Sequence, residues 1–232
     1  MTRRTPRHLT GTALTAALFL ASLGLAAPAY AETSCTVNGV AMTGPDIKGT
    51  DGADTIVCTS VDAGSVVDAL GGNDAITING PVNGSIRGGD GDDHFTVEST
   101  GSVGGTGSLD GQAGIDTFDV SGSVAGAVRG GQGQDDIHLY RGAALSQSGD
   151  IRGAKEADKI TIDAGVDVEG LVEGNEANDT ITIDTVGSDG RVHGDDGDDT
   201  ITVAHNKGTV DGGAGTDTCH VSGNPPLNCE IS

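Results

Sequence analysis

The sequence predicts an all-β fold, a parallel β-solenoid or β-roll of about nine coils whose two ends are closed by disulfides. Two observations lead to this prediction. The pattern apolar, any residue, then Gly-x-x-Gly-x-Asp-x-apolar-x-apolar recurs along almost the whole chain. The apolar residues that alternate after each aspartate indicate a strand with one buried face. One repeat of about 20 residues cannot bury its own apolar side, whereas stacked repeats cover one another.

The repeat aspartate occurs nine times, at intervals of 18 to 23 residues. Its positions are Asp54, Asp74, Asp93, Asp116, Asp135, Asp158, Asp179, Asp199 and Asp217. An apolar column precedes the turns, at Ile47, Val67, Ile86, Leu109, Val128, Ile151, Val172, Val192 and Val210. Segments such as 80–84 and 122–126 supply a second corner built from glycine. Two copies are degenerate, because Glu156 and Ala177 replace the second glycine. We expect like residues of neighbouring coils to stack about 4.8 Å apart.

Residues 1–31 have the features of a secretory signal peptide. Basic residues near the start precede an apolar run at 9–27, and Ala29-Tyr30-Ala31 fits the small-x-small cleavage rule. A membrane anchor is the alternative, but the run is barely long enough and contains Thr, Ser and Gly. Residues 32–232 then form one solenoid domain, with repeats at about 46–221, and we expect it to be secreted to the extracellular space.

The composition limits the partners. The chain carries 34 Asp and Glu against 12 Lys and Arg, a formal net charge of −22. This leaves no basic footprint for nucleic acid and favours cations. We expect a monomer, and a cell-surface or extracellular polymer is the class of macromolecule that remains as a partner.

The four cysteines lie near the ends of the repeat array. At the strand spacing above, the first and last coils are roughly 40 Å apart. A disulfide needs its two Cα atoms within about 7 Å, and export permits disulfides. We therefore predict the pairs Cys35–Cys58 and Cys219–Cys229, each covering an end where the core is open and the sheet edge is unpaired.

The stacked aspartates form a column of like charges that would repel one another. A hard cation between coils removes the repulsion. Calcium suits the column because it takes about six to eight oxygens from carboxylates and carbonyls, and glycine lets turn carbonyls face an ion. The predicted ligand carboxylates are Asp54, Asp74, Asp93, Asp116, Asp135, Asp199, Asp217, Asp51, Asp90 and Asp196. The predicted ligand carbonyls are those of Gly49, Gly72, Gly88, Gly91, Gly194, Gly197, Gly212 and Gly215.

Three segments carry a resemblance to a known family: Gly88-Gly-Asp-Gly-Asp-Asp-His-Phe95, Gly194-Asp-Asp-Gly-Asp-Asp-Thr-Ile201 and Gly212-Gly-Ala-Gly-Thr-Asp-Thr-Cys219. They resemble the hemolysin-type calcium-binding nonapeptide, the RTX repeat Gly-Gly-x-Gly-x-Asp-x-apolar-x, over about residues 46–221. The resemblance implies a parallel β-roll with calcium between adjacent turns, bound by aspartates and turn carbonyls. Here only one side of each coil carries the turn, so one calcium column is expected. The family often uses a C-terminal export signal, whereas this chain has an N-terminal one.

The turns differ in how well they suit calcium. The best sites are expected between Asp54 and Asp74, between Asp74 and Asp93, and between Asp199 and Asp217. The turns of Asp116 and Asp135 have few extra acids and are expected to bind through carbonyls plus one carboxylate each. Before Asp158, Lys155 or Lys159 is expected to replace calcium with a salt bridge. Turn-forming aspartate without any ion is the alternative for the whole column.

Two outward columns are also informative. One precedes the turns and mostly alternates in sign, which predicts a salt-bridge ladder on one face. It comprises Lys48, Asp68, Arg87, Asp110, Arg129, Arg152, Glu173, His193 and Asp211. The other contains Thr77, Thr96, Thr161, Thr182 and Thr202, interrupted by Val57, Asp119, His138 and His220. Threonine suits an exposed strand position in any case, although flat threonine ladders can bind ice or polymers.

The expected function is that of a secreted calcium-binding protein with a structural or adhesive role, folded by calcium and without enzyme activity. Two alternatives stay open. An enzyme acting on acidic polysaccharide would need a non-repeating cluster of Lys, Arg, Tyr and acids on one face, and none is apparent from the sequence. An ice- or surface-binding protein would use the threonine column.

Overall fold

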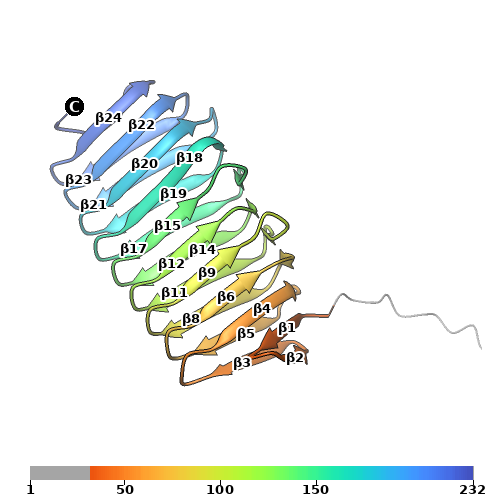
Figure 1. Cartoon of the computed structure of the whole chain (residues 1–232). Helices are drawn as coiled ribbons and strands as arrows, with labels where there is room; N and C mark the ends of the chain where they lie inside the picture. Colours follow the sequence, from red (N-terminus) through yellow and green to blue (C-terminus); the bar gives the residue numbers. More distant parts are fainter. Residues whose placement is uncertain (1–31, 232) are drawn as a thin grey trace, which may run out of the picture. The chain divides into compact units, whose positions relative to one another are not determined.

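The structure is a computed structural model, and it describes residues 32–231. The predicted signal peptide lies outside the described residues. Within them the regular elements are β-strands, stacked into the column of coils shown in Figure 1. No helix among these residues has the length and apolar character needed to cross a membrane. The predicted all-β solenoid is confirmed.

One wall of the solenoid, sheet B, has nine parallel strands, one from each coil. They are β3 (Asp46–Thr50), β5 (Val66–Leu70), β8 (Ser85–Asp90), β11 (Ser108–Ala113), β14 (Ala127–Gln132), β17 (Asp150–Lys155), β19 (Leu171–Glu176), β21 (Arg191–Asp196) and β23 (Thr209–Ala214). Each strand pairs with the next in register, so that Leu109 lies between Ile86 and Val128. The column of apolar residues predicted before the turns is therefore continuous.

The opposite wall, sheet A, contains the strands that follow the aspartates. They are β4 (Thr55–Ser60), β6 (Ala75–Ile78), β9 (His94–Val97), β12 (Thr117–Val120), β15 (Asp136–Leu139), β18 (Lys159–Val168), β20 (Thr180–Val186), β22 (Thr200–Asn206) and β24 (Thr218–Gly223). The glycine corners add two-residue strands, which stack in the order β16-β13-β10-β7 and join the same sheet through β18. These are β7 (Pro81–Val82), β10 (Ser102–Val103), β13 (Ser123–Val124) and β16 (Ala144–Leu145). The sequence predicted corners here, and the structure makes them short parallel strands.

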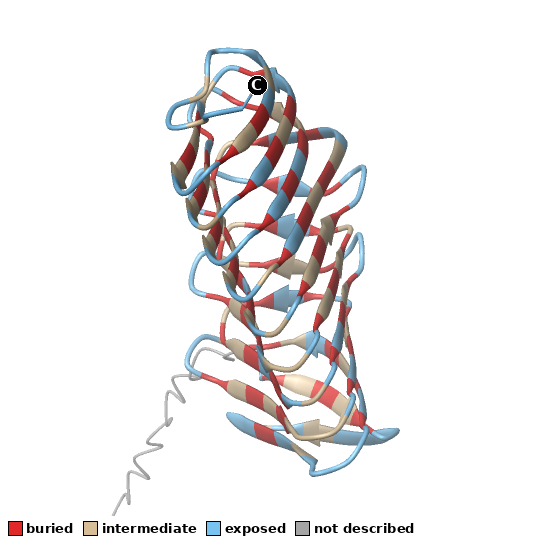
Figure 2. Ribbon diagram, turned by 90° about the vertical axis from the view of Figure 1, so that its left-hand side faces the viewer, coloured by how far each residue is buried: buried red, intermediate tan, exposed pale blue. Residues whose placement is uncertain are grey.

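The core lies between the walls and is built from stacked β-branched residues. Buried and exposed positions alternate along the strands, as Figure 2 shows. The two phenylalanines of the solenoid, Phe95 and Phe118, stack in adjacent coils with ring centroids 4.5 Å apart. The core is a narrow ladder in which each side chain is covered by its copies above and below. Few aromatic residues are needed to fill such a core.

Both predicted disulfides are present at the ends. Cys35–Cys58 joins the first coil to an antiparallel hairpin, β1 (Ser34–Val37) and β2 (Val40–Thr43), that covers the N-terminal edge of sheet A. Cys219–Cys229 ties the C-terminal tail to β24. The hairpin lies outside the repeats and was not predicted from the sequence.

Candidate metal-binding column

The nine repeat aspartates lie at the turn that joins a sheet B strand to a sheet A strand, each directly before the sheet A strand. Their exposed fractions are between 0 and 3%. Each coil repeats the same turn, and parallel pairing holds the coils in register. The aspartates therefore form a single buried stack along one edge of the solenoid, which we call the aspartate column.

The first carboxylate oxygen of each aspartate joins neighbouring coils. Asp116 Oδ1, for example, accepts a hydrogen bond of 2.8 Å from the backbone N–H of Asp93 in the coil before it. The same bond, between 2.7 and 2.9 Å, occurs at all eight steps from Asp54 to Asp217. Stacked aspartates are therefore joined to one another by backbone donors of the neighbouring coil.

In eight of the nine aspartates, the second carboxylate oxygen has no partner. Among the described residues, the Oδ2 atoms of eight column members are buried without a hydrogen bond. They belong to Asp74, Asp93, Asp116, Asp135, Asp158, Asp179, Asp199 and Asp217. A buried polar group without a partner costs about 1–3 kcal/mol, and more when it is charged. Eight such atoms in a row require either protonation or a cation.

Burial raises the pKa of seven carboxyls of the column, and the charges of neighbouring acids raise it further. The pKa reaches about 8 for Asp158, about 7 for Asp116 and about 7 for Asp179. It reaches about 6 for Asp93, Asp135 and Asp199, and it is raised for Asp74. In each case a backbone N–H of the neighbouring coil opposes the shift. Without an ion, the interior of the column therefore holds protons near neutral pH.

At a glycine of sheet B, a carbonyl from the next coil meets the free oxygens of Asp93, Asp116, Asp135, Asp179 and Asp199. A Cβ placed on Gly88 would lie 2.1 Å from Asp93 Oδ2 and 2.8 Å from the Gly111 carbonyl oxygen. At Gly194 the two distances are 2.2 Å to Asp199 Oδ2 and 2.3 Å to the Gly212 carbonyl oxygen. A free carboxylate oxygen and a backbone carbonyl oxygen converge on one point, and the absent side chain leaves it open. An oxygen set of this kind suits a hard cation such as calcium.

In the coils after the first, the turn backbone adopts the left-handed region at two positions, whichever residue stands there. The first position has φ +121° at Gly89 and +123° at Gly131, but also +81° at Leu70 and +97° at Ala154. The second is held by the predicted second glycine, and its two replacements, Glu156 (φ +63°) and Ala177 (φ +79°), keep the same conformation. The degenerate copies therefore preserve the turn, with left-handed residues that carry side chains.

Several predicted ligands lie elsewhere. Asp51, Asp90 and Asp196 are exposed on the outer side of the turns and are not in the buried column. The carbonyls of Gly72, Gly91 and Gly197 lie against the matching glycines of the next coil, Gly91, Gly114 and Gly215. The carbonyls that do meet free oxygens include three that the prediction left out, those of Gly111, Gly130 and Gly153. The sequence signal for these carbonyls was that Gly111, Gly130 and Gly153 each directly follow a residue of the outward charged column.

The first aspartate differs from the other eight. Asp54 Oδ2 accepts from the backbone N–H of Thr50 at 2.6 Å, and Asp54 Oδ1 accepts from the Asn38 side-chain amide at 2.5 Å. Thr50 occupies the position that is left-handed in later coils, but its own φ is not positive. The gap between Asp54 and Asp74, one of the three expected best sites, therefore lacks the free oxygen of the other gaps.

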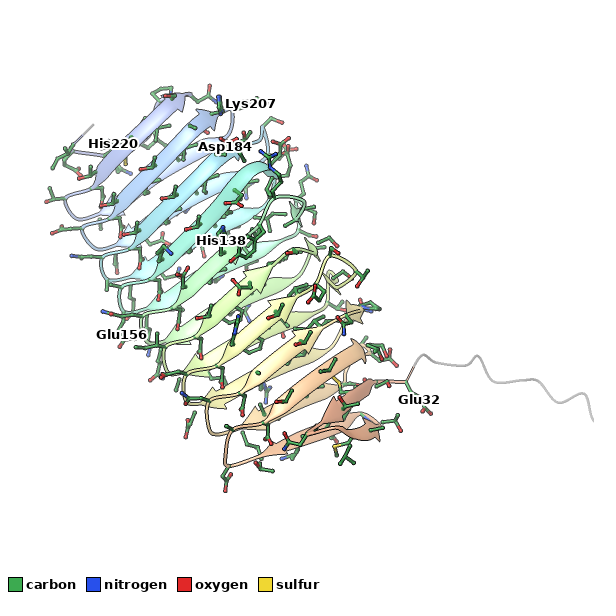
Figure 3. All side chains as sticks on the ribbon, in the orientation of Figure 1. Glu32, His138, Glu156, Asp184, Lys207 and His220 are labelled. Carbon is green, nitrogen blue, oxygen red and sulfur yellow. A yellow bond between two sulfur atoms is a disulfide. The ribbon has the colours of Figure 1, made fainter. Side chains whose placement is uncertain are left out.

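The expected lysine replacement at Asp158 is wrong. Lys159 Nζ pairs with Asp136 Oδ2 at 2.7 Å on the outer face, and within residues 32–231 no ion pair joins either lysine to Asp158. Asp158 Oδ2 stays free, as does that of Asp179. Both residues were left out of the predicted ligands because their turns looked degenerate, yet their carboxylates match the rest of the column. Figure 3 shows Glu156 at the outer edge of this turn.

The outward charged column stacks in the predicted order but forms little of the expected ladder. Lys48, Asp68, Arg87 and Asp110 pair in register along sheet B. Within the described residues, the one ion pair between members is Arg152–Glu173 at 3.2 Å. Arg152 also binds Asp150 at 2.8 Å, two positions back on its own strand. The charged column is therefore in register but has little direct pairing between its members.

The outer face of sheet A has a regular part and an irregular part. Towards the C-terminus Thr180 and Thr182 pair with Thr200 and Thr202, and Thr200 pairs with Thr218. The column of Thr182 and Thr202 was predicted from the sequence, and the column that begins each strand was not.

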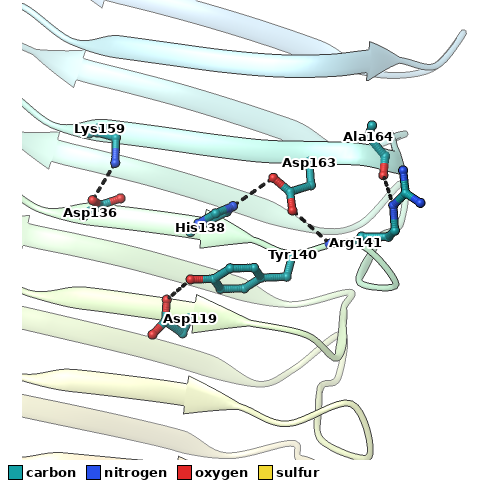
Figure 4. Close-up of polar contacts among 8 residues, drawn as sticks. All are labelled: Asp119, Asp136, His138, Tyr140, Arg141, Lys159, Asp163 and Ala164. Atoms are coloured by element: carbon teal, nitrogen blue, oxygen red, sulfur yellow. Dashed lines mark hydrogen bonds and ion pairs between the residues drawn. The ribbon is translucent and has the colours of Figure 1, made fainter.

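In the middle coils this face carries a cluster of charged and aromatic residues that we call the ionic band (Figure 4). It comprises His94, Asp119, Asp136, His138, Tyr140, Arg141, Lys159 and Asp163. This is a non-repeating cluster of the kind that was not apparent from the sequence. Its groups are paired with one another: His138 with Asp163 at 3.0 Å, and Tyr140 with Asp119 at 2.9 Å. The bond to Asp119 raises the pKa of the Tyr140 hydroxyl.

Fold and site together define a parallel β-solenoid with a buried acidic column along one edge. A crystal structure of a hyperactive, Ca²⁺-dependent, beta-helical antifreeze protein from an Antarctic bacterium is similar to this chain, with a TM-score of 0.58 and 26% sequence identity. The match covers 77% of this chain and 65% of that protein, so this chain spans less than two thirds of its length. No protein-family model matches the chain, and no curated protein does.

Proposed function

We propose that this is a secreted calcium-binding repeat protein of the hemolysin type, in which calcium between stacked turns completes the fold. The observation that carries the proposal is the row of eight buried Asp Oδ2 atoms without donors, five of which meet a carbonyl of the next coil at a glycine. Calcium would supply the missing positive charge between these oxygens. The similarity to a protein that depends on Ca²⁺ supports the same choice of ion.

Calcium binding would be coupled to folding. The oxygens of one gap come from two coils, so the unfolded chain has no such site, and calcium stabilises the folded state by mass action. Extracellular calcium modules commonly bind at about 0.1–1 mM. The chain would then leave the cell unfolded through its N-terminal signal and fold outside. We propose a structural or adhesive role without catalysis, because the groups of the ionic band are already paired.

Thermal unfolding of residues 32–232 tests this proposal. Circular dichroism would be recorded in calcium, in magnesium at equal concentration, and with a chelator. We expect calcium to raise the melting temperature well above the chelated value, and magnesium to do so less because it requires a tighter octahedron. Melting curves that coincide in all three conditions would show that the column does not bind these ions.

Ice binding is a second candidate function, favoured by the threonine columns and by the similar antifreeze protein. Strands of sheet A place Thr-x-Thr pairs at regular spacings, about 4.8 Å between coils and about 7 Å along a strand. Such a flat lattice of methyl and hydroxyl groups would face ice directly.

Thermal hysteresis in calcium tests this second function. We expect Thr202→Arg to abolish hysteresis, because a long charged side chain would break the flat face. Thr209→Arg is the matched control, since Thr209 is exposed on sheet B at the opposite wall. A wild-type protein without hysteresis would remove ice binding and leave the calcium proposal untouched.

A further inference from the structure

The C-terminal tail follows the path of a tenth coil. Leu227 forms a parallel bridge with Asp211 of sheet B, and Ile231 forms one with Thr218 of sheet A. The bonds are those of a regular coil: Gly212 N–H donates to the Leu227 carbonyl at 2.9 Å, and Ile231 N–H donates to the Asp217 carbonyl at 3.0 Å. Asn228 and Glu230 therefore lie where the next coil would place its glycine and its aspartate.

The oxygens of this tail match those of a regular gap. In the last regular gap, Asp199 N–H donates to Asp217 Oδ1 at 2.9 Å. One step further, Asp217 N–H donates to Glu230 Oε2 at 2.8 Å. A Cβ on Gly212 would lie 2.7 Å from Asp217 Oδ2 and 2.1 Å from the Asn228 carbonyl oxygen, just as Gly194 meets Asp199 and Gly212.

The side-chain length fits the shorter path of the tail. Five residues lead from Gly212 to Asp217 in the last regular turn, whereas two lead from Asn228 to Glu230. Glutamate reaches one methylene further than aspartate, which lets a shortened turn present its carboxylate at the column. The Cys219–Cys229 disulfide holds the residue between Asn228 and Glu230 against the last strand.

The geometry points to one more calcium site, beyond the repeats, formed by Asp217 Oδ2, the Asn228 carbonyl and the Glu230 carboxylate. This inference rests on the proposed function. It is supported by Asp217, which has an exposed fraction of 0% and an Oδ2 atom without a partner. The tail thereby does more than cover the end of the core. A competing explanation is that Glu230 only accepts the Asp217 N–H.

Glu230→Gln separates the two explanations, because glutamine keeps an oxygen that can accept the N–H and loses the charge that calcium needs. Bound calcium would be counted by native mass spectrometry and titrated by calorimetry. We expect the variant to bind one calcium fewer than the wild type. The matched control is Glu98→Gln, which removes the same charge at an exposed residue directly after β9, away from the column. It should bind as many calcium ions as the wild type.

The outcomes distinguish this site from the general proposal. If the wild type binds calcium and Glu230→Gln binds the same number with the same affinity, Glu230 is only a hydrogen-bond acceptor and the terminal site is rejected. If the wild type binds no calcium, both proposals fail. Far-UV circular dichroism with calcium verifies that each variant is folded, and if Glu230→Gln were unfolded, Glu230→Asp, whose shorter side chain would not reach, should lose the same ion.

Discussion

At the scale of single residues, the two oxygens of one carboxylate have different surroundings. Asp116 Oδ1 accepts a backbone N–H of the previous coil, whereas Asp116 Oδ2 is buried without a donor. A Cβ on Gly111 would lie 2.1 Å from this Oδ2 and 2.4 Å from the Gly130 carbonyl oxygen. The first oxygen sets the register of the coils, and the second leaves a charge to be neutralised. The stability of the column therefore depends on whether the charge on Oδ2 is neutralised.

Substituting Asp116 by Asn should have opposite effects with and without calcium. The amide keeps an oxygen for the Asp93 N–H and places an N–H₂ donor towards the Gly130 carbonyl. In chelator at pH 8, where a carboxyl with a pKa of about 7 is ionised, the substitution removes the buried charge, so we expect the variant to melt higher than the wild type, by the equivalent of about 1–3 kcal/mol. In calcium a ligand is lost, so we expect it to melt lower. Thermal melts in both buffers measure the difference, and a variant that melts lower in both would contradict the assignment of Oδ2.

The pH dependence of the calcium-free protein follows from the raised pKa values. The folded pKa of Asp158 is about 8, against an ordinary value of 3.8. The folded state therefore binds more protons than the unfolded chain between these values. The associated stability is complete below the unfolded pKa and is lost as the pH rises through the folded values of about 6 to about 8. In chelator, we expect the melting temperature to fall from pH 5 to pH 8.

Calcium should reverse this trend, because it binds the ionised carboxylates. The increase in melting temperature caused by calcium is then expected to grow between pH 5 and pH 8. Melts at matched ionic strength with and without calcium provide the measurement. A chelated protein whose stability rises over this interval would show that the column is not protonated in the folded state.

At the scale of the turn, the backbone conformation is kept where the glycine pattern fails. Repeat spacing and alternation were enough to predict both walls, the aspartate column and both disulfides. They were not enough to rank the turns as calcium sites, because the sequence pattern identifies a turn by its glycines. Ala177 and Glu156 adopt positive φ under the pairing of the coils above and below, and their aspartates are as buried as the others. The hairpin at 34–43 and the tail at 227–231 could not be predicted from a repeat to which they do not belong.

Restoring glycine at Ala177 should stabilise the protein. Left-handed backbone costs a residue with a side chain roughly 1–2 kcal/mol, and glycine removes most of this cost while the unfolded chain gains some freedom. We expect a net gain of about 1 kcal/mol in the free energy of unfolding, measured by denaturant titration in calcium. Ala75→Gly, in the exposed first position of β6, is the control and should lose about 0.5–1 kcal/mol. Equal losses in both variants would mean that Ala177 is not strained.

At the scale of the whole molecule, the aspartate column has unlike ends. At the N-terminal end the Asn38 amide and the Thr50 N–H satisfy Asp54 with neutral donors. At the C-terminal end Glu230 adds one more carboxylate. The formal net charge of the chain is −22. Its acidic column ends in neutral donors at the N-terminal end and continues with one further carboxylate at the C-terminal end. The two disulfides, although both cover ends of the core, should differ in their relation to calcium.

Replacing each disulfide by a pair of alanines tests this difference. Loss of either disulfide is expected to lower the free energy of unfolding by about 3 kcal/mol, with or without calcium, because the unfolded chain gains conformational freedom. Cys219→Ala with Cys229→Ala also frees the tail that carries Asn228 and Glu230. This variant should therefore show a smaller rise of melting temperature on calcium addition than the wild type. Cys35→Ala with Cys58→Ala should keep the full rise, because Asp54 is satisfied without an ion. Equal calcium responses in the two variants would show that the tail and the hairpin are both plain covers of the core.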